Sequence, residues 1–259
     1  MNFRDYLIHH KQVVDSEVEG WFYPIDIVIL YGLLNEIQKE ITGDICEIGV
    51  AYGKSAISIS NFKQPTDNLY LYDIFSEDIK NKAHANIKKF GKDENIIWRI
   101  QDTTDLRFEN LVFENKLKFL HIDGCHEHSV VLNDLTVFSA KMDDMGVICV
   151  DDFNDYEYPG VNSAVCQFML SKYNYNNWKI FAIGHNKAFL CQERYHRSYQ
   201  KSCLEFMEKA KFEMNVPEEI EVFYGVREIY DTNVLLFNSR LKWSIEETYN
   251  NLFKKPKVV

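Results

Sequence analysis

The stretch from residue 45 to residue 55 reads Ile45-Cys46-Glu47-Ile48-Gly49-Val50-Ala51-Tyr52-Gly53-Lys54-Ser55. The run from Ile45 to Val50 is mostly apolar, and Glu47 is its one charge. Gly49 and Gly53 stand four positions apart, and a helical pattern begins near Ser55, which can cap that helix. A strand, a glycine turn and a helix in this order form the first crossover of a nucleotide-binding α/β sheet, because glycine lets the backbone turn sharply and approach a ligand.

The spacing of the two glycines separates this loop from a dinucleotide site. Such a site has the pattern G-x-G-x-x-G and aims a helix N-terminus at a pyrophosphate group, whereas this loop reads E-x-G-x-x-x-G. The carboxylate of Glu47 would repel a phosphate but suits a cation or an amine. The pattern resembles the first motif of class I S-adenosylmethionine-dependent methyltransferases, whose ligand carries an ammonium and a sulfonium group and no phosphate. Many α/β turns contain two glycines, so the assignment to this class depends on the residues at the ends of the other strands.

The composition limits the class of protein. With 259 residues, of which 46% are hydrophobic and 14% aromatic, the chain can bury the core of one large α/β domain, alone or with an appendage. A net charge of −10 argues against a nucleic-acid partner, which requires a basic face, and a small polar ligand fits better. The sequence has no run of about 18 apolar residues, so we expect no membrane span.

The cysteines and the first residues indicate a reducing compartment. The six cysteines form no C-x-x-C motif and several fall in predicted strands, so we expect buried, reduced thiols. Residues 1–20 carry six charged side chains, which is unlike a signal peptide. We therefore expect a cytoplasmic protein.

Predicted strands and helices alternate from residue 24 to residue 192. A helix is expected to begin at Pro24 and to end near Glu40, because its apolar residues recur at helical spacing. The predicted strands are 45–50, 69–74, 96–100, 118–123 and 147–150, followed by a β-hairpin of 178–183 and 187–191. The later helices are 76–90 with Ser76 as its cap, 130–142 stopped by Asp143, Asp144 and Gly146, and 159–171. This alternation predicts an α/β fold with a mainly parallel sheet, an antiparallel edge and helices on both faces.

Residues 194–259 fit this alternation less well. We divide the chain into a domain of residues 1–193, which includes an N-terminal helical cap, and a C-terminal α/β appendage of residues 194–259. The appendage has a predicted helix at 199–212, a break at Pro217, a strand at 234–237 and a last helix opened by a capping box at Ser244. We expect it to belong to the same domain or to form an oligomer contact, and we expect a homodimer.

Two strand ends carry candidates for binding an adenosine group. Asp73 ends the second predicted strand, 26 residues after Glu47, where a carboxylate can accept hydrogen bonds from two ribose hydroxyls. A solvated loop aspartate is the alternative. Gln101 and Asp102 follow the third strand and could hold an adenine amino group, although a plain loop would look the same.

Acidic residues also end the fourth and fifth predicted strands. Asp123 follows one of them, and the pair Asp151-Asp152 follows the other. Since ligands of open α/β sheets bind beyond the carboxyl ends of the strands, we expect these side chains to meet. Adjacent carboxylates repel unless a cation or proton joins them, and three of them suit Mg²⁺ or Mn²⁺. An isolated Asp-Asp would more often be a solvated turn or a helix cap, but Asp123 favours a metal site.

His126 stands three residues after Asp123. A neutral imidazole beside a metal-bound hydroxyl is a natural general base near pH 7. His128 is the competing candidate, on a loop or helix start. His121 lies inside an apolar strand and is predicted to be a core residue.

These motifs together are similar to those of the metal-dependent class I O-methyltransferases, and most of all to the macrocin type, which methylates sugar hydroxyls. The resemblance covers about residues 25–192 and is carried by Glu47–Ser55, Ile122–His126, Gly146–Asp152 and Pro159–Val161. It implies a Rossmann-like sheet of seven strands with the last one antiparallel. It implies S-adenosylmethionine at Glu47, Gly49, Gly53, Ser55 and Asp73, with Tyr52 of the same loop as a further candidate, and a divalent metal at Asp123, Asp151 and Asp152. In related catechol O-methyltransferases a lysine base stands where this chain has His126.

The resemblance implies methyl transfer to a sugar hydroxyl, of a nucleotide-linked hexose or heptose or another precursor of carbohydrate biosynthesis. A catechol is the alternative acceptor. A nicotinamide-dependent oxidoreductase would need the glycine triplet that residues 45–55 lack. A non-catalytic binding module would have no need of the three aspartates and His126.

Overall fold

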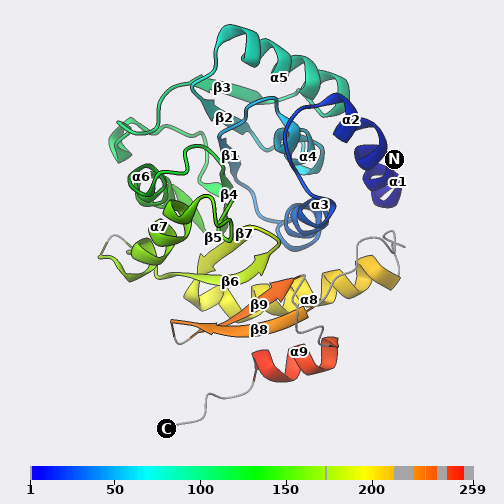
Figure 1. Ribbon diagram of the computed structural model, residues 1–259, viewed down its shortest axis with the longest axis vertical. Helices are drawn as coiled ribbons and strands as arrows, with labels where there is room; N and C mark the ends of the chain where they lie inside the picture. Colours follow the sequence, from blue (N-terminus) through cyan, green and yellow to red (C-terminus); the bar gives the residue numbers. More distant parts are fainter. Residues whose placement is uncertain (1, 173, 213–223, 231, 238–243, 254–259) are drawn as a thin grey trace.

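The computed structural model describes residues 2–172, 174–212, 224–230, 232–237 and 244–253. Within these residues one sheet of nine strands has the order β3-β2-β1-β4-β5-β7-β6-β9-β8 (Figure 1). The strands are β1 (Asp44–Ile48), β2 (Leu69–Asp73), β3 (Ile96–Ile100), β4 (Leu117–Ile122), β5 (Met142–Val150), β6 (Trp178–Gly184), β7 (Lys187–Gln192), β8 (Tyr224–Ile229) and β9 (Thr232–Phe237). The helices are α1 (Phe3–His9), α2 (Asp15–Glu17), α3 (Pro24–Tyr31), α4 (Lys54–Phe62), α5 (Glu77–Phe90), α6 (His128–Ser139), α7 (Pro159–Leu170), α8 (His196–Phe212) and α9 (Ile245–Leu252), with π-helical turns at His10–Val14 and Gly32–Ile37.

The first seven strands form the predicted Rossmann-like sheet. β1 lies parallel to β2 and β4, and β3 and β5 extend the parallel part on either side. β7 runs antiparallel to both β5 and β6. The predicted fold class is therefore confirmed, including the antiparallel last strand.

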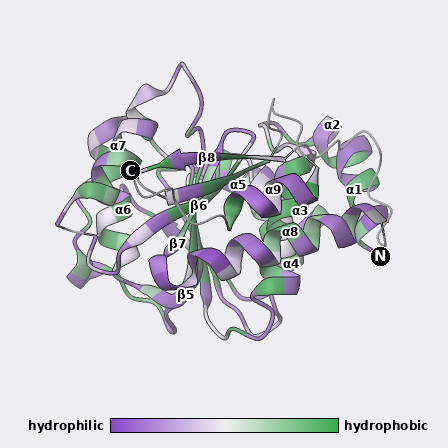
Figure 2. Ribbon diagram, turned by 90° about the horizontal axis from the view of Figure 1, so that it is seen from below, coloured by the Kyte–Doolittle hydropathy of each residue, from purple (hydrophilic) through white to green (hydrophobic). Residues whose placement is uncertain are grey.

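Two cores lie on opposite faces of the sheet, because successive strand residues point to opposite sides. Ile45 of β1 faces the core that contains α3, α4 and α8, whereas Cys46 and Ile48 face the core beneath α6 and α7. Figure 1 shows these helices on the two sides of the strands, and in Figure 2 apolar and polar residues alternate along them, as expected for helices packed on a sheet.

The C-terminal segment continues the same sheet. β9 pairs parallel with β6, through Ala182 with Leu235, and β8 pairs antiparallel with β9. Gln200 of α8 joins the two parts, because its amide nitrogen donates to the carbonyls of Phe181 and Asn233 at 3.0 and 2.6 Å. The sheet thus has two strands more than the seven predicted, while the capping box at Ser244 is confirmed. Pro217 lies outside the described residues.

Several local predictions are confirmed and others are wrong. Pro24 begins α3, and Ser76 caps α5 by accepting from the backbone N–H of Ile79. Ser55 is not a helix cap: α4 is capped by Gly53, whose φ of 85° ends the turn two residues earlier, and Ser55 is buried in the first turn.

The helix predicted at 130–142 ends at Ser139, and Met142 already belongs to β5. Asp143, Asp144 and Gly146 therefore lie in a strand instead of ending a helix. The register between β4 and β5 is irregular here, since Leu117 pairs with Met142 but Phe119 pairs with Val147. Such a bulge leaves extra residues outside the ladder, which accommodates polar side chains in the strand.

All six cysteines are free, as expected. Cys46, Cys149, Cys191 and Cys203 are buried, but Cys125 is exposed, in the loop after β4. Within the described residues, no helix is long and apolar enough to cross a membrane.

Gly49 sets how closely β1 and β4 approach each other at their carboxyl ends. Its φ is 83°, and a Cβ built on it would lie 2.0 Å from the carbonyl oxygen of Asp123. The N–H of Asp123 in turn donates to the carbonyl of Ile48 at 2.8 Å. The glycine loop and the loop after β4 are therefore in direct backbone contact, which only glycine at position 49 permits.

We expect Gly49→Ala to lower the free energy of unfolding by about 3 kcal/mol or more, because the new methyl group meets backbone atoms and the residue must keep a positive φ. Gly53→Ala is the matched control. Its φ is 85°, but its Cβ would meet the flexible side chain of Ile87 at 3.3 Å and the carbonyl oxygen of Ala83 at an ordinary contact distance of 3.5 Å, so a loss of about 1 kcal/mol is expected. Urea unfolding followed by circular dichroism measures both, and equal losses would contradict this account of Gly49.

Candidate active site

The glycine loop is held in place by Asp73 at the end of β2. One carboxylate oxygen, Oδ2, accepts the backbone N–H groups of Val50 and Ala51 at 2.7 and 2.9 Å. Ala51 has a φ of 44°, so the hydrogen bonds fix a turn that alanine rarely adopts. The structure thus places Asp73 at the end of the second strand, as predicted, and shows that it shapes the glycine loop.

Glu47 lies deeper than the loop. It is completely buried, and its Oε1 lies 2.8 Å from Nδ1 of His121 on the neighbouring strand. Its other oxygen, Oε2, has no hydrogen-bond partner among the described residues. A buried carboxylate oxygen without a partner is costly, and an ammonium group is the kind of donor that would satisfy it.

The other predicted cofactor residues surround the loop. Tyr52 is half-buried, and its carbonyl accepts from the side chain of Asn86 on α5 at 3.0 Å. Gln101 and Asp102 are exposed after β3, where Asp102 accepts from the backbone N–H of Thr104 at 2.8 Å. Ser55 is buried in α4.

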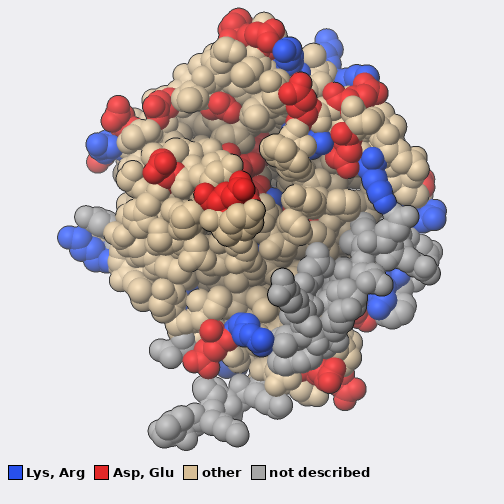
Figure 3. Space-filling model, in the orientation of Figure 1, with Lys and Arg blue, Asp and Glu red and all other residues tan. Residues whose placement is uncertain are grey.

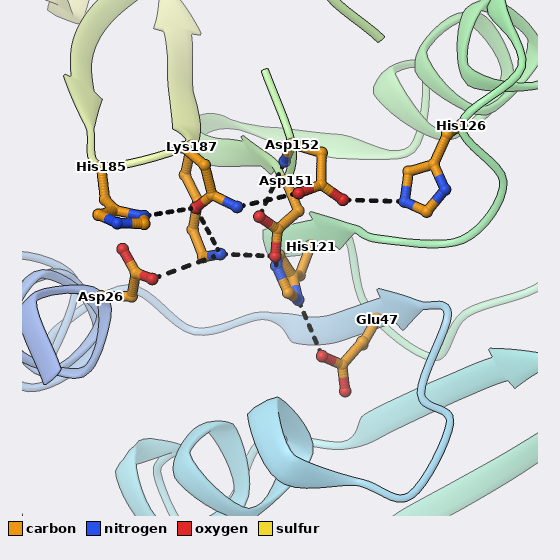
Figure 4. A network of polar contacts seen from close by, with 9 residues as sticks. Asp26, Glu47, His121, His126, Asp151, Asp152, His185 and Lys187 are labelled. Carbon is orange, nitrogen blue, oxygen red and sulfur yellow. Dashed lines mark hydrogen bonds and ion pairs between the residues drawn. The ribbon is translucent and has the colours of Figure 1, made fainter. Parts of the chain in front are cut away.

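A row of charged side chains crosses the sheet on the face that carries α3. His121 of β4 points its Nε2 toward Asp151, whose Oδ2 is 3.6 Å away. The ammonium group of Lys187, at the start of β7, lies 2.5 Å from the same oxygen and 3.4 Å from Oδ2 of Asp26 in α3 (Figure 4). We call Glu47, His121, Asp151, Lys187 and Asp26 the inner row. All five side chains are buried.

A second group lies nearer the surface. Nε2 of His126 is 2.8 Å from Oδ2 of Asp152, and the His126 ring stacks on Tyr158 with 3.9 Å between ring centres. Asp152 also accepts from the side-chain amide of Asn186 at 3.0 Å. Asp123, His126 and Asp152 each offer one ligand atom within 4.8 Å of the others. We call these three residues the outer set.

The neighbours Asp151 and Asp152 point in different directions because their backbones differ. Asp152 has a φ of 55°, and its N–H donates to Oδ1 of Asp151 at 2.8 Å. Asp151 consequently turns inward to Lys187, while Asp152 turns outward to His126. The three predicted metal ligands are therefore divided between two sets that share Asp123, the outer set and a set of His121, Asp123 and Asp151.

The pKa shifts follow from burial and from these partners. Burial raises the pKa of Asp123 well above its usual range, and the nearby charge of Asp151 adds to the effect. Burial alone would also raise the pKa of Asp151, but Lys187 and His121 together hold it well below its usual range. The close contact with the carboxylate of Asp152 raises the pKa of His126. Asp151 is therefore the ionised partner of Lys187, while Asp123 binds a proton readily unless a cation joins it.

The three histidines differ in what surrounds them. His121 is buried, as predicted, but it bridges two carboxylates instead of packing among apolar groups. His128 uses both ring nitrogens on α7, with Ser163 at 2.7 Å and Gln167 at 2.8 Å. His126 is the histidine at the outer set, and about a third of its side chain is exposed.

Lys187, Asp26, Asn186 and Tyr158 were missed by sequence reasoning. Two of them left a signal: Asp26 is a lone charge in the apolar run of α3, and Lys187 opens the apolar strand β7. Lone charges in such runs are rarely buried without a partner. No pattern in the sequence pairs the two, because β7 and α3 meet only in the folded sheet. In Figure 3 acidic side chains surround a recess in the middle of the face onto which this edge of the sheet opens.

Known proteins share this fold and part of this sequence. Residues 46–153 match a family model described as a methyltransferase domain. The uncharacterized protein R132 of Acanthamoeba polyphaga mimivirus is 31% identical over 190 residues, which are 66% of this chain and 80% of that protein. The chain belongs to the class I S-adenosylmethionine-dependent methyltransferases. The nicotinamide-dependent alternative is thereby set aside.

Solved structures agree with this assignment at the level of the fold. Cofactor-bound Rv0187 from MTB has a TM-score of 0.56 at 13% identity, covering 73% of this chain and 95% of that one. CalS11, a TDP-rhamnose 3'-O-methyltransferase of calicheamicin biosynthesis, has a TM-score of 0.52 at 11% identity, covering 72% and 86%. The mycinamycin-pathway methyltransferase MycE, in complex with Mg and SAH, has a TM-score of 0.53 at 15% identity, covering 73% of this methyltransferase and 54% of MycE.

We expect Asp73→Ala to weaken binding of S-adenosylhomocysteine by about 10- to 100-fold, because a charged hydrogen-bonding group is lost and the glycine loop loses its two contacts. Asp73→Asn is the matched control, since its amide oxygen can still accept from Val50 and Ala51. It should keep most of the thermal stability that the alanine variant loses while still binding less tightly than wild type. Isothermal titration with unchanged affinity in Asp73→Ala would exclude this role.

Proposed function

We propose that this methyltransferase transfers the methyl group to a sugar hydroxyl with the help of a divalent metal ion, Mg²⁺ or Mn²⁺, at the outer set. The observation that carries the proposal is the position of that set. Asp123, His126 and Asp152 meet within 4.8 Å, and the backbone of Asp123 touches Gly49 of the cofactor loop. A methyl donor in that loop and an acceptor at the outer set would therefore be neighbours, as transfer requires.

The residues of the loop suit S-adenosylmethionine, which supplies the methyl group. Gly49 and Gly53 leave the backbone open to a ligand. Glu47 offers an ammonium group a buried oxygen that has no partner among the residues described, and Asp73 stands at the end of β2 for the ribose. Gln101 and Asp102 remain our candidates for the adenine.

The outer set suits a hard divalent cation. Asp123 and Asp152 provide carboxylate oxygens, the ligands that Mg²⁺ and Mn²⁺ prefer, and Asp123 is a partly buried acid that a cation would keep ionised. A cation held there would lower the pKa of a hydroxyl that it coordinates. Asp151, the third predicted ligand, is bound to Lys187 in this structure.

His126 would serve as the general base. Its Nε2 lies on Asp152 at 2.8 Å and its ring is fixed against Tyr158. Asp152 raises the proton affinity of the imidazole, and the loop position leaves the ring accessible to a hydroxyl. In this arrangement His126 takes the hydroxyl proton, and the resulting oxygen nucleophile is the methyl acceptor.

The acceptor class rests on the resemblance and on the neighbours. Adjacent hydroxyls of a hexose offer two oxygens to one cation, as catechol does. CalS11 is described as acting on TDP-rhamnose, which supports a nucleotide-linked hexose as the acceptor to test first. A catechol remains the second candidate.

The experiment is an incubation of the purified protein with S-adenosylmethionine, Mg²⁺ or Mn²⁺, and a panel of TDP-linked hexoses and catechols, analysed by mass spectrometry. We expect a hexose product heavier by one methylene group, its loss with EDTA, and its return with added metal. A product formed at full rate after exhaustive chelation would remove the metal from the mechanism, and a product from catechol alone would overturn the sugar acceptor.

We expect His126→Asn to lower kcat by about 10²–10⁴-fold, the usual cost of losing a general base. Melting temperature and affinity for S-adenosylhomocysteine should change little, because His126 is partly exposed and contacts Asp152 and Tyr158 near the surface. His128→Asn is the control and should retain most of its activity. Near-normal kcat in His126→Asn would exclude it as the base, and loss of Mn²⁺ binding in that variant would make it a metal ligand instead.

A further inference from the structure

We propose that the ammonium group of Lys187 is a permanent cation of the inner row, with Asp151 as its counter-ion. A single divalent ion then binds at the outer set. The inference rests on the metal site proposed above. It assigns a role to a lysine outside the cofactor loop, and it divides the two adjacent aspartates into one metal ligand and one supporting residue.

The contacts of Lys187 show a charge built into the fold. Its Nζ lies 2.5 Å from Oδ2 of Asp151 and 3.4 Å from Oδ2 of Asp26, and 3.3 Å from Oδ1 of Asn186. Only 3% of its side chain is exposed, and Phe22 lies against the ammonium group at 5.4 Å from the ring centre. The group is therefore enclosed between α3, β5 and β7, with Phe22 against it.

Asp26 is the reason that Lys187 is held on both sides. Its two oxygens are buried without a hydrogen-bond partner among the described residues, and the ammonium group of Lys187 forms an ion pair with it at 3.4 Å. If the lysine moved away to admit a metal ion, Asp26 would be left as a buried carboxylate without a counter-ion, which is strongly destabilising. The pair Asp26 and Asp151 thus fixes the ammonium group between helix and sheet.

The ammonium group contacts one member of the second possible metal set, Asp151. His121, Asp123 and Asp151 bring ligand atoms within 4.8 Å of one another, but Oδ2 of Asp151 already faces Lys187. A divalent ion in that set would stand beside the ammonium group, and at short range in a buried site like charges repel strongly. The outer set shares Asp123 but has its own Asp152, which points away from Lys187.

The charges of the two groups support the same division. In the inner row each of the three carboxylates lies beside a cation, Glu47 beside His121 and both Asp151 and Asp26 beside Lys187. In the outer set Asp152 lies beside His126, whereas Asp123 forms no ion pair with any residue that the structure describes. Asp123 is thus the carboxylate that lacks a cation, and a divalent ion held by Asp123 and Asp152 would supply one.

Asp151→Asn and Asp152→Asn form a matched pair for the test, since the two residues are adjacent and the change is the same. We would titrate the full-length protein, saturated with S-adenosylhomocysteine, with Mn²⁺ and measure free Mn²⁺ by electron paramagnetic resonance. Wild type should bind one ion. Asp152→Asn should lose saturable binding, whereas Asp151→Asn should bind one ion no more than about 10-fold less tightly, as expected for a group that only supports a ligand. Equal loss in both variants would overturn the proposal.

Lys187→Met tests the same idea from the other side. With the ammonium group removed, the set of His121, Asp123 and Asp151 becomes available, and we expect either a second Mn²⁺ or binding at least about 10-fold tighter. Unchanged stoichiometry and affinity would overturn the role of Lys187. If this variant does not fold, the two asparagine variants decide alone. Absence of Mn²⁺ binding in wild type would instead remove the metal from the proposed function, which is a different result.

Discussion

The contact between Lys187, Asp151 and Asp26 joins three elements that are far apart in the sequence: α3, β5 and β7. Breaking a buried ion pair by removing one partner costs about 3–5 kcal/mol, because the remaining charge keeps its burial and loses its compensation. The pair therefore fixes the antiparallel strand against the parallel part of the sheet at the edge where the site lies. It also determines that Asp151 faces inward. With Asp151 held there and Asp152 at a positive φ, the second aspartate is turned toward His126.

The site is thus built from two layers of charge. The inner row is buried and internally paired, and it shapes the sheet edge. The outer set is partly exposed, it contains Asp123, which has no ion-pair partner among the described residues, and it is in backbone contact with the glycine loop through Gly49. This contact places the candidate acceptor site next to the glycine loop. Fold and cofactor class follow from the architecture, whereas the acceptor depends on side chains around the recess.

Much of the fold was predictable because local signals agreed with the tertiary structure. Pro24, Ser76 and the capping box at Ser244 mark helix starts by backbone chemistry alone, and the alternating strands specify a parallel sheet. The errors came where tertiary contacts decided. Met142 lies in a strand because a bulge accommodates Asp143 and Asp144. Ser55 is not the helix cap because the helix begins after Gly53, which has a left-handed conformation. Asp123, His126 and the Asp151-Asp152 pair were recognisable at strand ends, but the partition between them was not, since Lys187 and Asp26 meet only in the folded sheet.

The central claim is that this methyltransferase has one metal position, between Asp123 and Asp152. The other possible set is not available to a metal because Lys187 holds its member Asp151. The most direct measurement is a crystal structure of the protein with S-adenosylhomocysteine and Mn²⁺, with anomalous diffraction used to locate the metal. The account predicts one anomalous peak, coordinated by Asp123 and Asp152, with Lys187 still bound to Asp151. A peak coordinated by Asp151 and His121, with Lys187 displaced, would contradict it.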